Sequence, residues 1–142
     1  MIKTILVAHD GSDGSARALD WAIELARQTD ARLVVVHAWS TLEELGRRKP
    51  PYEPKDLHEE ALTRLRDEWS RPAVEAGIPF EARVIEDLPV PGLVRAARDV
   101  DADLLVCGTR GRGGIKGLVL GSVARELPAK SHRPVTVVPP VG

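Results

Sequence analysis

The feature that most constrains this chain is the repeated change in the spacing of its apolar residues. Short runs rich in Val, Ile and Leu alternate with segments whose apolar residues recur every three to four positions, the spacing of one helical face. The expected strands are Ile2–Ala8, Arg32–Ala38, Ile78–Ile85, Asp103–Cys107 and Pro134–Val138. Strands that alternate with helices predict a mainly parallel sheet, with right-handed crossovers and helices on both faces.

Four helices are expected between those strands. Ser12 is placed to cap the first, because its hydroxyl can accept from an otherwise unpaired backbone N–H. Pro72 should end or kink the second, Pro91 should open the third at its first position, and Pro128 should kink the fourth or shift its start. The expected ranges are Ser15–Thr29, about Asp56–Ser70 with the apolar row Leu57, Ala61, Leu65 and Trp69, from Pro91 onward, and from Gly121 to about Lys130.

The proline-rich stretch Trp39–Pro54 predicts a mobile loop. We therefore expect one α/β domain over residues 1–142, a Rossmann-like, doubly wound sheet of five parallel strands in the order 3-2-1-4-5 with about four helices.

Composition excludes several classes of protein. A chain that is 43% hydrophobic and 29% charged is not a disordered tail. The formal net charge of −1 argues against a nucleic-acid or anionic-membrane partner. The single cysteine, Cys107, can form no internal disulfide and no zinc site. No apolar run approaches a membrane span and the first residues lead into a strand, so we expect a soluble, cytoplasmic protein.

The carboxyl ends of the expected strands are where an open parallel sheet binds ligands. Asp10 follows the first strand and can serve either a ligand or the Asp-Gly-Ser turn. His9 and Asp10 should point to opposite faces, since successive strand residues alternate. His37, on a valine-rich strand, is expected to be a core histidine rather than a base, and Cys107 a small buried hydrophobe.

A glycine-rich segment links the fourth strand to the fourth helix. Between Gly108 and Ser122 it carries Arg110, Arg112 and Lys116 and no acidic residue. Backbone amides, a helix amino terminus and basic side chains together favour an anion such as phosphate. The segment lacks the Gly-Lys-Ser/Thr of a Walker loop and the third glycine of a dinucleotide fingerprint. The alternative is a flexible basic surface loop.

The spacing G-x2-G-x9-G-(S/T) is met by Gly108, Gly111, Gly121 and Ser122. With this motif the chain resembles the nucleotide-binding members of the universal stress protein family. The opening ILVAHDGS is similar to the family's first strand and turn, VVVHA to its second strand, and SHRPVTVVP to its last. The resemblance covers nearly the whole chain.

The resemblance implies an ATP site. Asp10 would approach the nucleotide and hydrogen-bond the ribose or bind Mg²⁺ that bridges the phosphates, and Ala38 would touch the adenine. The remaining pocket residues implied are Ala8, Cys107, Gly108, Gly111, Arg112, Gly121, Ser122 and Val123. The basic, glycine-rich loop favours a phosphate group and does not distinguish between ATP, AMP and cyclic AMP as the ligand.

These residues are compatible with two functions. The first is a stress-response protein that binds ATP without rapid turnover, because no nucleophile–base pair is found, although slow hydrolysis is conceivable. The alternative is an interaction module that binds no nucleotide. In either case the apolar edge strand Pro134–Val138 predicts a homodimer in which two such edges meet, as in the family it resembles.

Overall fold

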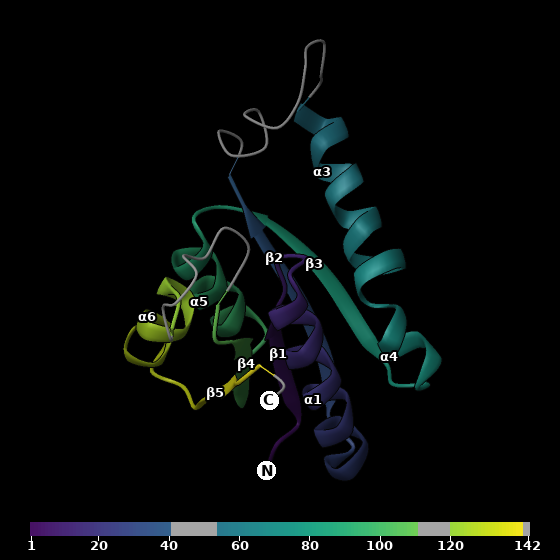
Figure 1. The fold of residues 1–142 in the computed structure, drawn as a ribbon, viewed down its shortest axis with the longest axis vertical. Helices are drawn as coiled ribbons and strands as arrows, with labels where there is room; N and C mark the ends of the chain where they lie inside the picture. Colours follow the sequence, from purple (N-terminus) through teal and green to yellow (C-terminus); the bar gives the residue numbers. More distant parts are fainter. Residues whose placement is uncertain (41–53, 111–119, 141–142) are drawn as a thin grey trace.

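The computed structural model describes residues 1–40, 54–110 and 120–140. Five strands form one parallel sheet in the order β3-β2-β1-β4-β5 (Figure 1). Their bounds are β1 Thr4–Ala8, β2 Arg32–Trp39, β3 Phe80–Glu86, β4 Leu104–Gly108 and β5 Val135–Val138. The predicted fold class and strand order are confirmed.

Helices cover both faces of the sheet (Figure 1). One face carries α1 (Asp13–Thr29), the π-helical segment η1 (Arg64–Trp69) that continues α3 (Pro54–Thr63), and α4 (Arg71–Glu75). The other face carries α5 (Pro89–Asp99) and α6 (Ser122–Ser131). Because both faces are covered, the central strands bury successive residues on alternate sides and read as continuous apolar runs.

Several boundaries differ from the expected ones. The third helix begins at Pro89 rather than Pro91, because Leu88 is its extended N-cap. The expected break near Pro72 is present: the second helix ends at Trp69 and α4 begins at Arg71. Pro72 occupies the second position of α4, where its missing N–H leaves no helical bond unmade. Trp39 is not part of a loop but closes β2, with 3% of its surface exposed. Residues 41–53 of the expected loop lie outside the described residues.

The cap at Ser12 is confirmed. Its Oγ accepts from the backbone N–H of Ser15 at 3.2 Å. Pro128 lies inside α6, which nevertheless runs from Ser122 to Ser131. The apolar row of the second helix is also present, since Leu57, Ala61 and Leu65 are buried.

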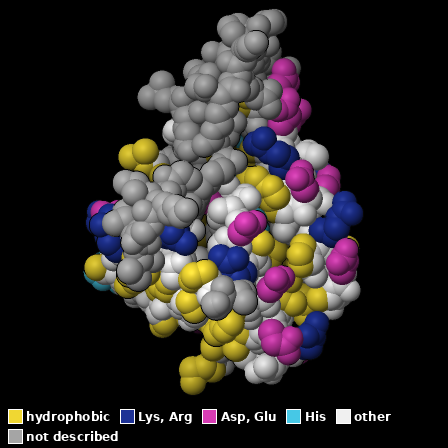
Figure 2. Space-filling view, viewed as in Figure 1, with side chains coloured by type: hydrophobic (Ala, Val, Ile, Leu, Met, Phe, Trp, Pro, Cys, Tyr) yellow, Lys and Arg dark blue, Asp and Glu magenta, His cyan; other side chains and the backbone are white. Residues whose placement is uncertain are grey.

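The described surface carries no single-sign face in the view of Figure 2, where basic and acidic side chains are interspersed. Within the described residues, no helix is long and apolar enough to cross a membrane.

Candidate functional site

The predicted site residues that the structure describes gather at the carboxyl edge of the sheet, where the winding direction reverses. β1 lies between β2 and β4, so the segments that follow β1 and β4 lie on either side of the point where the winding direction reverses. The backbone N–H of His9 donates to the carbonyl of Val36 at 2.9 Å, which extends the pairing of β1 with β2 one residue past Ala8. Asp10 therefore leaves the sheet at the position where ligands bind in folds of this class.

Asp10 is held by a small hydrogen-bond network. Its Oδ1 accepts from the Ser15 hydroxyl at 2.8 Å and from the Ser12 backbone N–H at 3.0 Å. Its own N–H donates to Ser15 Oγ at 3.2 Å. The turn role proposed as an alternative for this aspartate is thus realised, and the same network fixes the carboxylate at the sheet edge. The ligand-binding role stays a prediction.

The first turn of α1 packs directly on the end of β4. A Cβ placed on Gly108 would lie 2.8 Å from the carbonyl carbon and oxygen of Gly14. A Cβ on Gly14 would in turn lie 2.8 Å from the carbonyl oxygen of Arg110. Glycine at 108 is therefore required by backbone packing, whatever it also offers to a ligand.

Gly14 was missed in the sequence. The signal for it was present, since Asp-Gly-Ser occurs twice in succession at residues 10–15. Only the second glycine meets the loop after β4.

The two ends of the glycine-rich segment meet. The backbone N–H of Gly121 donates to the carbonyl of Thr109 at 2.6 Å. This bond brings the start of α6 to the end of β4, so that exposed Ser122, the first residue of α6, lies at the sheet edge. Val123 packs against the core between the sheet and α5. Gly111 and Arg112 lie outside the described residues.

Three predicted pocket residues belong to the face covered by α5 and α6. Ala8 packs on that core, and Ala38 and Cys107 follow the same alternation of their strands. A Cβ on Gly92 would lie 3.1 Å from the Cβ of Ala38, so α5 closely approaches this side chain. Burial raises the pKa of the Cys107 thiol to about 11, which confirms it as a small buried hydrophobe rather than a reactive thiolate.

On the opposite face, two histidines surround an indole. His9 stacks on Trp69 with ring centroids 5.2 Å apart and an angle of 12° between the ring planes. His37 meets the same indole edge-on at 5.1 Å, and its Nδ1–H donates to the His9 carbonyl at 2.9 Å. Both histidines are 4% exposed, so the expectation of a core histidine at 37 is confirmed.

The described residues hold no group of three or more His, Cys, Asp or Glu side chains that could bind a metal ion. A protein-only metal centre therefore has no support in this part of the chain. Asp10 is the one predicted metal ligand, and a single carboxylate suits Mg²⁺ only when phosphates and water supply its other ligands.

Comparison with known proteins gives a consistent result. A model of the universal stress protein family matches residues 1–139. A universal stress protein of Thermus aquaticus is 38% identical over 143 residues, covering 97% of this chain and 99% of that protein. A crystal structure of a universal stress protein in complex with cAMP is 31% identical with a TM-score of 0.73, covering 96% of each chain. The universal stress protein of Archaeoglobus fulgidus in complex with dAMP is 29% identical with a TM-score of 0.68, covering 96% of this chain and 98% of that one.

Proposed function

Because this chain belongs to the universal stress protein family, we propose that it binds an adenine nucleotide at the carboxyl edge of its sheet. The nucleotide is ATP with Mg²⁺, and it is retained without rapid turnover. The observation that carries the proposal is the convergence of the Asp10 turn, Gly108 and the amino end of α6 at the point where the sheet reverses its winding.

The amino end of α6 supplies the phosphate chemistry. The first amides of a helix have no partner within it and carry partial positive charge. In α6 the first intrahelical bond runs from Arg125 N–H to the Gly121 carbonyl, so the amides of Ser122 to Ala124 precede it. Two relatives of about 30% identity bind cAMP and dAMP, which supports an adenine nucleotide as the guest.

Magnesium fits this site only as an ion shared with the phosphates. The carboxylate of Asp10 stands at the edge, and Mg²⁺ is commonly bound by one or two carboxylates plus substrate phosphates and water. Asp10 would be its protein ligand, and the ion would neutralise phosphate charge beside the carboxylate.

We propose binding rather than enzymatic turnover. His9, the histidine nearest Asp10 in sequence, uses its Nδ1 to accept the Gly11 N–H at 3.1 Å, and burial lowers its pKa to about 4. A buried ring engaged in this way is a poor general base for an attacking water. Purified protein that turned over ATP at about 1–1,000 s⁻¹, the ordinary range for enzymes, would contradict this part of the proposal.

The test is the nucleotide content of protein purified without added nucleotide. We expect about one equivalent of ATP per chain in the supernatant after heat denaturation, measured by anion-exchange chromatography, if binding is tight and exchange slow. AMP or ADP in its place would identify another ligand or reveal hydrolysis. If no nucleotide is found, titration with Mg²⁺-ATP distinguishes weak, exchangeable binding from no binding. Absence of binding there favours the interaction module.

We propose further that the protein is a homodimer. β5 lies at the edge of the sheet, and its four residues are half-buried. An exposed edge pairs readily with another strand unless it is covered, and a second copy of β5 would cover it. Light scattering at micromolar concentration should give twice the chain mass of 15.4 kDa. A monomeric mass would exclude this dimer. A role in stress and a cytoplasmic location stay predictions.

A further inference from the structure

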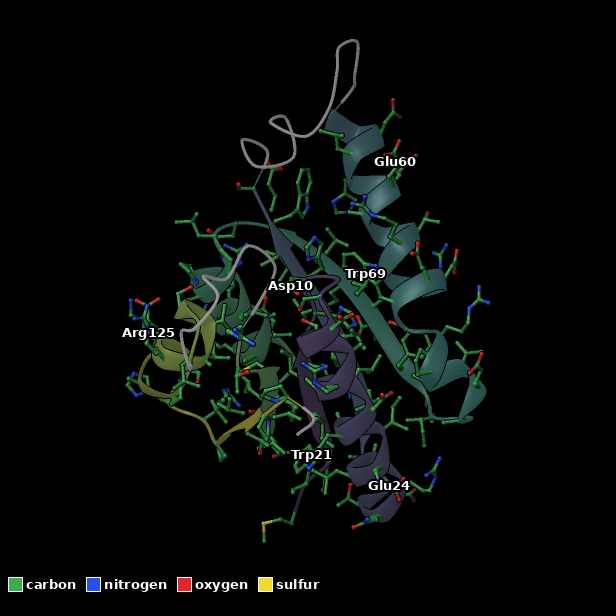
Figure 3. All side chains as sticks on the ribbon, in the orientation of Figure 1. Asp10, Trp21, Glu24, Glu60, Trp69 and Arg125 are labelled. Carbon is green, nitrogen blue, oxygen red and sulfur yellow. The ribbon has the colours of Figure 1, made fainter. Side chains whose placement is uncertain are left out.

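Trp69 lies beside the candidate site although it is distant from it in the sequence. It ends η1, and in Figure 3 its label stands next to that of Asp10 at the amino end of α1. Its indole stacks on His9 at 5.2 Å. A Cβ placed on Gly11 would lie 2.5 Å from Cζ2 of the indole, and Gly11 has a φ of +84°. The indole therefore contacts the residues on both sides of Asp10.

We propose that Trp69 is a positioning residue for the nucleotide site: by stacking on His9 and packing on Gly11, it holds the turn that presents Asp10. The inference rests on the proposed function, since it assigns a role at the same site. A turn fixed before the ligand arrives loses less conformational freedom on binding than a turn that must be ordered then.

The hydrogen bond that closes the turn depends on the orientation of the His9 ring. Its Nδ1 accepts the Gly11 N–H at 3.1 Å, and the indole, stacked on the ring with an angle of 12° between the planes, fixes the plane in which Nδ1 lies. His37 from β2 meets the same indole edge-on, so the indole is itself held in place.

Removing the indole should free the imidazole to turn out of the plane in which its Nδ1 meets the Gly11 N–H. The turn would then have to be ordered when the nucleotide binds, so the affinity of the folded variant should fall. A smaller aromatic ring at position 69 should restore the stack and with it the affinity. If Trp69 only fills the core, its removal would lower the stability of the fold and leave the affinity of the folded protein unchanged.

The experiment compares wild type, Trp69→Ala and Trp69→Phe by calorimetric titration with Mg²⁺-ATP at about pH 7.5, and urea unfolding checks that each protein is folded under these conditions. For Trp69→Ala we expect a Kd about tenfold above that of wild type, the upper range for loss of one aromatic pair. Trp69→Phe keeps a stacked ring and should restore the Kd to within about threefold of wild type.

The matched control is Trp21→Ala, which removes an exposed tryptophan, 41% accessible, from the middle of α1. It should leave the Kd for Mg²⁺-ATP unchanged. Trp69→Leu replaces Trp69→Ala if the latter does not fold, since it keeps apolar volume without the stack. A wild-type protein that binds no ATP would end the proposed function itself and the inference with it. Wild-type affinity in a folded Trp69→Ala or Trp69→Leu protein would overturn the positioning role alone.

Discussion

Acidification from pH 6.5 to pH 4 is expected to lower the free energy of unfolding by about 3 kcal/mol through His9 alone. The pKa of His9 falls from 6.5 to about 4 in the folded protein, chiefly because the ring is buried. Between these two values the unfolded chain binds the proton and the folded protein does not. Stability is therefore complete above pH 6.5 and is lost as the pH falls toward 4.

Urea unfolding at pH 7, 6, 5 and 4.5 measures this loss. The informative variant is His9→Asn, whose Oδ1 can replace Nδ1 as the acceptor for Gly11 and which does not titrate. It should be less stable at pH 7, because the stack on Trp69 is gone, yet lose much less stability on acidification. His132→Asn is the matched control, since His132 is exposed at the left-handed end of α6, with a φ of 54°, a conformation that Asn adopts readily.

Asp103 does not interfere with this measurement. Hydrogen bonds from the backbone N–H groups of Lys3 and Thr4 lower its pKa from the ordinary value of 3.8. The stability that a carboxyl group gains from a lowered pKa is also lost on acidification, but this loss occurs below about pH 4 rather than above it. Equal losses in wild type and His9→Asn between pH 6.5 and 4.5 would refute the assignment to His9.

The fold could be predicted because its pattern is local. Alternating strand and helix periods, buried valine runs and a capping serine each depend on neighbours in sequence, and a right-handed crossover rule then limits the topologies. The cap at Ser12 and the parallel sheet with helices on both faces were predicted for these reasons. The pattern does not fix boundaries near prolines, since Pro89, Pro91 and Pro72 each stand in the first turn of a helix.

The supporting contacts of the site could not be predicted in this way. Leu57, Ala61, Leu65 and Trp69 are spaced four apart, which fits an α-helix, and nothing in that spacing indicates the π-helical turn from Arg64. The contact of Trp69 with Gly11 joins residues far apart in the sequence. The resemblance implies a ligand contact for Gly108, whereas its close approach to the backbone of Gly14 joins residues far apart in the sequence and is seen only in the structure.

The sharpest test of the phosphate end is Gly121→Val, for which we expect a loss of Mg²⁺-ATP affinity of about a hundredfold or more, equivalent to about 2.7 kcal/mol. Gly121 is the N-cap of α6 with φ −79° and ψ 177°. This is extended backbone that valine adopts without strain, so the fold should persist. The branched side chain would stand beside the amides of Ser122 and Val123, which precede the first intrahelical bond of α6 and where the phosphates are proposed to bind.

Calorimetric titration measures the affinity, and urea unfolding measures whether the fold is kept. Ala129→Val is the matched control, because it introduces the same branched side chain at an exposed position of the same helix. It should bind Mg²⁺-ATP as wild type does. Wild-type affinity in a folded Gly121→Val protein would place the phosphates away from the start of α6. The anion would then have to be held by Asp10-bound Mg²⁺ and by the loop between Arg110 and Gly121, without the amides of the helix.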